Sequence, residues 1–257
     1  MILWFSGTGN SADVASRLAS LTADRTVRLS PSLTDITLDP AEKRVVWVFP
    51  VHSWGVPPFV RQRIELIRFH GPVVTHHMVA TCGDDAGMTD RMWRADMHRA
   101  GHQTGAAFTV IMPNTYVAMK GFDVDAPDLA ARKLAESKEA VESIASQLPA
   151  IESRGEQYTQ VIRGAFPRLK TSVIYPWFMR YAIRPSKFKV ADVCVECGRC
   201  ERICPTANIC RPDGRPAWGE ACTGCLACYH ICPANAISYG SATKGKGHYV
   251  NPAVNSQ

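Results

Sequence analysis

The stretch LWFSGTGNSAD, residues 3–13, places a glycine-rich turn directly after a short apolar run. Gly7 and Gly9 let backbone amides face inward, and Ser6, Thr8 and Ser11 supply hydroxyl groups. A helix that begins after such a turn adds its positive end to these donors. The stretch therefore predicts a phosphate site at the start of a helix.

The first 150 residues alternate strand-like and helix-like segments. Short apolar runs at residues 2–5, 45–49, 73–81 and 107–112, with a weaker one near Val27, are candidate strands. Residues 12–21, 59–69, 89–100 and 127–148 have helical spacing of apolar positions. This alternation predicts an α/β domain over residues 1–150, with five parallel strands in a doubly wound sheet.

Composition narrows the class of protein. The 257 residues are 46% hydrophobic and 20% charged, as in globular chains, and no apolar run approaches the ~20 residues of a membrane-spanning helix. Because the first expected strand begins beside Met1, no room is left for a signal segment. We expect a cytoplasmic location.

Basic charge is concentrated in the second part of the chain. Residues 1–150 hold 15 Lys and Arg against 16 Asp and Glu, whereas residues 151–257 hold 14 against 7. Residues 151–189, rich in aromatics and proline, predict a connector that packs on the surface. The positive charge of this connector either attracts an acidic redox partner, or belongs to a solvated surface that only holds the two domains together. An anionic membrane is a weaker alternative, and without a nucleic-acid-binding motif we expect no nucleic acid.

Nine of the ten cysteines lie between residues 194 and 232, and eight of these belong to an internal repeat with an offset of 28. Each copy reads C-x2-C-x2-C-x3-C-P, which is the bacterial 4Fe-4S arrangement. Since the fourth cysteine of each copy ligates the other cluster in two-cluster proteins, two sets are expected. The first is Cys194, Cys197, Cys200 and Cys232, and the second is Cys222, Cys225, Cys228 and Cys204. A pair of structural zinc sites is the alternative, but zinc does not require the whole motif twice.

Residues 190–240 resemble the bacterial two-cluster ferredoxins, and every ligand position of that motif is filled. The resemblance implies a small α+β domain and low-potential, one-electron transfer, with residues 241–257 as a C-terminal tail. Cys210 lies outside the motif, and we expect it to be a small buried residue rather than a ligand.

Three phosphate ligands compete for the turn at residues 6–11. ATP is disfavoured because no lysine follows either glycine. A dinucleotide fits Gly7, Gly9 and Ala12, but residues 27–30 lack the acid that would bind the ribose, and Arg28 keeps NADP open. FMN needs only a phosphate nest and a flat slot for its ring.

Two further loops favour FMN, because in a doubly wound sheet the ligand lies at the carboxyl ends of the strands. They are residues 50–58 and 81–87, and together with the first turn they resemble the flavodoxin family. That resemblance implies that Ser6, Gly7, Thr8, Gly9, Asn10 and Ser11 hold the phosphate, and that Trp54, Gly55, Cys82, Gly83 and Asp84 lie near the ring.

The third loop departs from the flavodoxin pattern, because it has no aromatic residue to cover the outer face of the ring. Tyr116 or the cluster domain covers this face, or the face is open to a substrate. Cys82 is expected to be a buried cysteine rather than a ring contact, and His52 a loop hydrogen-bonder rather than a proton donor.

The whole order of segments resembles the EFR-type ferredoxins, in which a flavodoxin-like domain is fused to a two-cluster ferredoxin domain. The resemblance implies an electron carrier that passes electrons between two 4Fe-4S clusters and FMN and exchanges them with a redox partner protein. An alternative is a flavoenzyme that reduces a small molecule at FMN with electrons from its own clusters. A third hypothesis is a redox-sensing regulator, and the basic connector is the only feature of the sequence that favours it.

Overall fold

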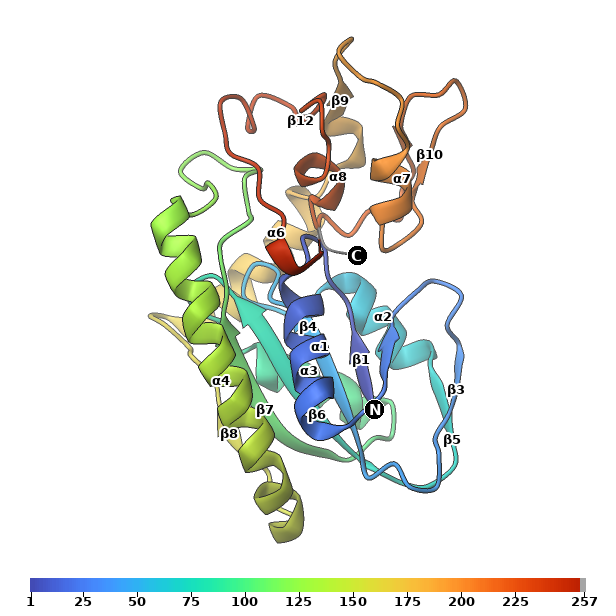
Figure 1. Ribbon diagram of the computed structural model, residues 1–257, viewed down its shortest axis with the longest axis vertical. Helices are drawn as coiled ribbons and strands as arrows, with labels where there is room; N and C mark the ends of the chain where they lie inside the picture. Colours follow the sequence, from blue (N-terminus) through green and yellow to red (C-terminus); the bar gives the residue numbers. More distant parts are fainter. Residues whose placement is uncertain (255–257) are drawn as a thin grey trace.

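A sheet of six parallel strands forms the centre of the first part of the chain (Figure 1). The structure is a computed structural model and describes residues 1–254. The strand order is β2-β1-β4-β6-β7-β8. The strands are β1 (Ile2–Trp4), β2 (Thr26–Arg28), β4 (Arg44–Pro50), β6 (Thr75–Cys82), β7 (Thr104–Ile111) and β8 (Thr159–Gln160).

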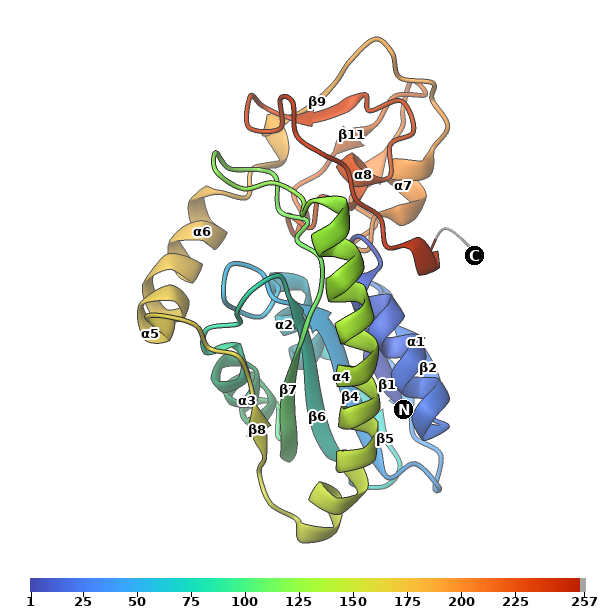
Figure 2. The same cartoon turned by 60° about the vertical axis from the view of Figure 1, so that its left-hand side comes forward.

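Two helices cover each face of this sheet (Figures 1 and 2). They are α1 (Asn10–Thr22) and α4 (Pro127–Arg154) on one face, and α2 (Pro58–Leu66) and α3 (Thr89–Arg99) on the other. Successive residues of β4 alternate between the two cores, because side chains along a strand point to opposite faces. Trp47 packs with α2 and α3, whereas Val46 and Val48 pack with α1 and α4.

The predicted doubly wound sheet is confirmed, with two differences. The order of its first five strands is the flavodoxin-like order, second-first-third-fourth-fifth. The prediction of five strands is one too few, because β8 pairs with β7 from residues assigned to the connector. A separate parallel pair, β3 (Asp35–Thr37) with β5 (Arg68–His70), was also not predicted.

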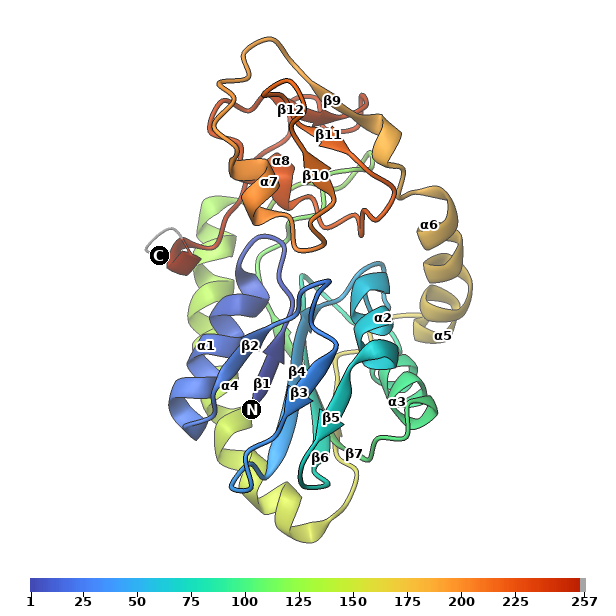
Figure 3. The same ribbon diagram turned by 90° about the vertical axis from the view of Figure 1, so that its right-hand side faces the viewer.

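The connector is helical over residues 167–181. It consists of α5 (Pro167–Leu169), the π-helical turn η1 (Lys170–Ile174) and α6 (Tyr175–Tyr181), and we call it the connector helix. It lies at the outer edge of the molecule, beside α2 and α3 (Figure 3). The prediction of a surface connector without regular pattern therefore missed a helix of 15 residues. The π turn ends at Ile174, two residues before Pro176, whose missing N–H disturbs regular α-helical bonding.

The cysteine-rich part lies at the carboxyl edge of the large sheet (Figures 1 and 3). It contains two short antiparallel pairs, β9 (Phe188–Val190) with β12 (Ile237–Tyr239) and β10 (Ile209–Cys210) with β11 (Ala217–Trp218). Its other elements are η2 (Pro185–Lys187), α7 (Arg199–Ile203), α8 (Ala227–His230) and η3 (Pro252–Val254). Phe188, Ile237 and Tyr229 form its own small core. Within residues 1–254, no helix has the length and apolar character needed to cross a bilayer.

Candidate functional site

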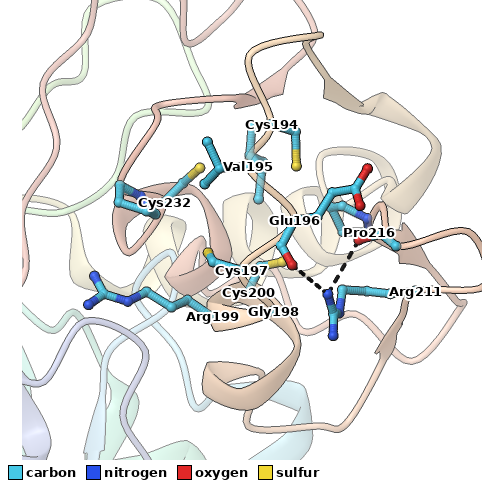
Figure 4. A pocket seen from close by; sticks show the side chains of 13 residues that line it. Cys194, Val195, Glu196, Cys197, Gly198, Arg199, Cys200, Arg211, Pro216 and Cys232 are labelled. Carbon is cyan, nitrogen blue, oxygen red and sulfur yellow. Dashed lines mark hydrogen bonds between the residues drawn. The ribbon is translucent and has the colours of Figure 1, made fainter.

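The first cysteine set lines one pocket of the ferredoxin-like part (Figure 4). Cys194, Cys197 and Cys200 come from the loop before α7 and its first turn, and Cys232 comes from the turn after α8. Burial raises the pKa of the Cys200 thiol, and the neighbouring Cys197 and Cys232 raise it further. The structure thus brings the fourth cysteine of the second copy to the first three of the first copy.

The second set is brought together in the same crossed way and lies deeper. Burial raises the pKa of Cys228 well above its usual value, and Cys225, Cys222 and Cys204 add to this rise. Burial likewise raises the pKa of Cys225 to about 12. Such thiols stay protonated unless a metal centre replaces the proton, so cluster assembly here is coupled to proton release.

Both copies of the motif have the same backbone conformation. Left-handed residues recur at the offset of 28: Glu196 with Gly224, Gly198 with Leu226, and Ala207 with Asn235. Left-handed residues within such loops turn successive amides toward one side, which forms an anion-binding nest. The duplication therefore extends from sequence to backbone shape.

Hydrogen bonds to sulfur repeat as well. The Asn208 amide donates to Cys204 Sγ at 3.3 Å, and the Ala236 amide donates to Cys232 Sγ at 3.2 Å. These contacts hold the two crossing cysteines in equivalent positions. Amide donors of this kind also tune the reduction potential of a bound cluster.

Unsatisfied donors beside the second set fit a cluster. Thr223 Oγ1 is buried and has no hydrogen-bond partner among the described residues, and the buried Trp218 Nε1 has no acceptor other than the Cys228 sulfur. Thr223 follows Cys222, and Trp218 lies near Cys228, where it lowers the thiol pKa against the effect of burial. The sulfides of a cluster would supply the acceptors that these groups lack. Within residues 1–254, no group of three or more His, Cys, Asp or Glu side chains is placed to hold a single metal ion.

The glycine-rich turn leads into α1 as predicted. Gly9 has a φ of 99°, in the left-handed region that favours glycine, and the helix begins at Asn10. The first turn of a helix leaves backbone N–H groups without helical partners, and these are the donors a phosphate needs. The amino end of α1 therefore fits a phosphate.

The side chains of this loop are largely occupied by protein partners. Ser6 Oγ accepts from the Gly9 amide at 3.1 Å, and Ser11 Oγ bonds with Thr81 Oγ1 at 2.7 Å. Asn10 Nδ2 donates to the carbonyl of Pro113 at 3.0 Å. Of the residues expected to hold the phosphate, Ser6, Asn10 and Ser11 thus shape the loop through their side chains.

The C-terminal tail also binds this loop. The Asn251 amide donates to the Thr8 carbonyl at 2.8 Å, and Tyr249 Oη donates to Asn10 Oδ1 at 2.8 Å. Asn251 Nδ2 donates to the same oxygen at 3.1 Å. Asn251 is buried, so the tail is a fixed part of the loop's surroundings.

Cys225 of the second cysteine set packs directly on the glycine-rich turn. A Cβ at Gly7 would lie 3.0 Å from the Cys225 carbonyl oxygen and 3.1 Å from its Cβ. Glycine at this position therefore lets the loop that carries Cys225 approach the start of α1 at van der Waals distance.

The connector helix covers the two later loops. A Cβ at Gly55 would lie 2.3 Å from the ring of Tyr175, whose hydroxyl donates to the Val56 carbonyl at 2.6 Å. Lys170 Nζ lies 5.0 Å from the centre of the Trp54 ring. Trp54 itself has a φ of 63°. Thr171 Oγ1 donates to the Trp54 carbonyl at 2.7 Å and helps to hold this strained conformation.

The third loop is fixed by groups that the sequence did not single out. Asn114 packs so closely on Gly83 that a Cβ there would overlap it. Lys133 Nζ donates to the Gly83 carbonyl at 2.9 Å and pairs with Asp125 at 2.7 Å, while the predicted Asp84 is exposed. Lys133 occupies a position on the buried face of α4, and a lysine at an apolar position of an amphipathic helix is the sequence signal for its contact with Gly83. The contacts of Tyr249 and Asn251 with the glycine-rich turn have no such signal.

Burial keeps the side chains of Cys82 and His52 in their neutral forms near neutral pH. Burial, together with Asp85 and Asp84, raises the pKa of the Cys82 thiol to about 12, so it stays protonated. Burial lowers the pKa of His52 to about 4, and its ring bonds to the backbone of Thr223. Tyr116 packs between the rings of Phe122 and Phe178.

Comparison with known protein families supports the prediction that the cysteine-rich part binds iron-sulfur clusters. A family model described as a 4Fe-4S binding domain matches residues 219–238, and a second with the same description matches residues 191–207. No curated protein matches the chain.

Solved structures similar to this chain include a flavodoxin and two azoreductases. The flavodoxin of Streptococcus pneumonia TIGR4 has 15% identity and a TM-score of 0.36, over 58% of this chain and 96% of its own. The azoreductase of Bacillus anthracis str. Sterne has 11% identity and a TM-score of 0.37, over 57% and 98%. The azoreductase AzrA has 12% identity and a TM-score of 0.36, over 57% and 99%.

Fold and site together define the class. The chain is an iron-sulfur protein in which a flavodoxin-like α/β domain precedes a ferredoxin-like region with two 4Fe-4S binding motifs.

Proposed function

We propose that this chain is an electron-transfer flavoprotein that links two 4Fe-4S clusters to FMN and exchanges electrons with a redox partner protein. A cluster carries one electron and FMN carries two, so the three together convert between one-electron and two-electron partners. The observation that carries the proposal is the contact of Cys225 with Gly7, because it joins a cluster ligand to the loop that would hold the FMN phosphate.

The residues of the two sets have different roles in this proposal. Cys197 is exposed, whereas Cys228 is buried and Cys225 packs against Gly7 of the glycine-rich turn. The first set would therefore exchange electrons with the partner, and the second would pass them toward FMN. The amino end of α1 would hold the phosphate, and Trp54 would contact the ring.

The experiment begins with anaerobic purification and assays of iron, sulfide and flavin. We expect about eight irons, about eight sulfides and one FMN per chain. A reconstituted preparation that holds zinc in place of iron, or binds no flavin, overturns the proposal.

Single-turnover reoxidation then tests the route. The reduced protein is mixed with an oxidised two-cluster ferredoxin as the protein acceptor, and loss of electrons from clusters and flavin is followed by absorbance. We expect Cys194→Ala to keep its FMN but to be reoxidised at least about tenfold more slowly, since one ligand of the outer cluster is lost. The prediction that Cys210 is buried is wrong: it is exposed at the end of the short strand β10, where its thiol faces the carbonyl of Ala217. Because Cys210 lies outside both sets, Cys210→Ala is the matched control and keeps the normal rate. Equal rates for both variants, or reoxidation by small molecules alone, contradict the route.

A further inference from the structure

Exposed apolar side chains gather on the connector. Seven of the thirteen large exposed hydrophobic residues of the described chain lie between Tyr158 and Tyr181. Five of these form a row along the connector helix, which we call the apolar stripe: Phe166, Leu169, Val173, Trp177 and Tyr181. Their exposed fractions range from 45% to 76%.

The stripe follows helical geometry. From Leu169 onward its members are spaced four residues apart, so they lie along one side of the helix. In Figures 2 and 3 the connector helix forms the outer edge of the molecule, and no other element lies outside it. The exposed stripe therefore belongs to a helix at the outer edge of the molecule.

The opposite side of the same helix holds it to the α/β domain. Thr171, Tyr175 and Phe178 are buried there, and Arg163 just before the helix pairs with Asp90 at 2.8 Å. Because these contacts fix the helix in place, the stripe is preformed and costs little conformational entropy to use.

Basic residues flank and interleave the stripe in the sequence. Residues 157–191 contain seven Lys and Arg and no Asp or Glu. Arg163 and Lys170 are paired with carboxylates of the α/β domain. The other five are exposed and form no ion pair among the described residues: Arg168, Arg180, Arg184, Lys187 and Lys189.

We propose that the apolar stripe and its five exposed basic residues bind the surface of an anionic lipid bilayer. The helix would lie in the plane of the interface, with Val173 and Trp177 inserted among the lipids and the basic side chains on the headgroups. Trp177 and Tyr181 are residue types that favour this boundary, since each combines an apolar ring with a polar atom.

The dimensions favour lipid over a protein surface. Five half-exposed side chains of this size present on the order of 500 Å², less than the ~800 Å² per partner of a stable protein interface. A single row on a helix at the outer edge suits insertion into a deformable surface, and the absence of acids over residues 157–191 suits anionic headgroups.

The test is flotation of the intact chain with lipid vesicles. Vesicles of phosphatidylcholine alone are compared with vesicles that contain one quarter phosphatidylglycerol, at low and at high salt. We expect binding to the anionic vesicles, weakened at least about tenfold by high salt or by neutral lipid.

Variants locate the surface. Val173→Asp places a charge in the stripe, whereas Val73→Asp places the same charge at a residue that is 87% exposed elsewhere. We expect Val173→Asp to weaken binding about tenfold or more and Val73→Asp to leave it unchanged. Arg168→Gln with Arg180→Gln should reduce the salt dependence, and circular dichroism checks that each variant is folded.

Other occupants give different results. Absence of binding to anionic vesicles, or equal loss with both Asp variants, overturns the proposal. A dimer that Val173→Asp converts to monomer in sedimentation analysis, without vesicle binding, assigns the stripe to a second copy. Retention on poly-glutamate but not on vesicles assigns it to an acidic protein. None of these outcomes depends on FMN or cluster content, so the proposal can fail independently of the electron-transfer function.

Discussion

The crossed cysteine sets allow a sharp test with paired variants. Cys194 and Cys232 line the same pocket, so replacing both by alanine should damage only one cluster. Cys194 and Cys204 belong to different sets, since Cys204 lies with Cys222, Cys225 and Cys228. Replacing both should therefore damage the two clusters together.

The expected magnitude follows from the number of clusters left intact. With about eight irons in the unchanged chain, the variant Cys194→Ala with Cys232→Ala should keep about four. The variant Cys194→Ala with Cys204→Ala should keep far fewer, approaching zero. Both variants lose two cysteines, so a difference between them reports which cysteines share a cluster.

The assay is iron and acid-labile sulfide per chain after anaerobic reconstitution. Cys210→Ala serves as the control for loss of a cysteine that belongs to neither set, and should keep about eight irons. If the pair Cys194 and Cys204 keeps four irons and the pair Cys194 and Cys232 keeps almost none, each cluster uses the four cysteines of one motif copy. That result would refute the crossed assignment.

Three further changes test the packing of the chain. Gly55→Ala would place a Cβ 2.3 Å from the Tyr175 ring, and we expect a loss of about 2 kcal/mol from overpacking, seen as a lower melting temperature that Tyr175→Ala partly reverses. Arg163→Ala leaves the buried Asp90 carboxylate without its bidentate partner, and should loosen the connector by about 3 kcal/mol, measured as faster hydrogen exchange in residues 167–181. Burial lowers the pKa of His76 to about 3 in the folded chain. Because the unfolded chain binds that proton more readily, stability should fall as pH drops from about 6.5 toward 3, and His76→Gln should flatten this slope; an unchanged slope would show that other groups dominate.

The spacing of apolar residues predicted the α/β domain well. It failed where contacts between distant residues determine where a helix ends or whether a strand forms. The helix expected to end at residue 148, before a proline, continues to Arg154 and ends at Gly155 with a left-handed φ of 64°. Ile151, beyond that proline, is buried with the core of this sheet face, and its packing offsets the missing N–H of Pro149. The strand β8 has only two residues, too few for any alternation to be recognised.

The connector shows a second limit of sequence reasoning. Its prolines and aromatics predict irregular structure, yet Pro167 begins a helix and Pro176 follows a π turn that accommodates it. Prolines favour the first turn of a helix as well as loops. The local sequence therefore left both outcomes open, and contacts with the α/β domain select the helix.

In the candidate site, the cysteine sets could be predicted from the sequence, whereas the contacts around the glycine-rich turn could not. Cysteine spacing is a local property that carries the ligand chemistry, and the structure brings together the two sets expected from the repeat. Contacts such as Tyr249 with Asn10 join residues far apart in the chain and obey no spacing rule. For that reason, the neighbours of the phosphate loop could not be predicted from the loop's own sequence.

The contact of Gly7 with Cys225 is the strongest evidence that the α/β domain and the cysteine-rich part act together. A glycine in a phosphate loop is usually explained by the approach of a ligand, but here its open side faces Cys225. A side chain at Gly7 would have to push the cluster-bearing loop away, and the Asn251 tail that binds the adjacent Thr8 carbonyl resists such movement. The same few atoms therefore position the start of α1 and the second cysteine set. Under the proposed function, a change that disturbs phosphate binding at α1 should also alter electron transfer from that set.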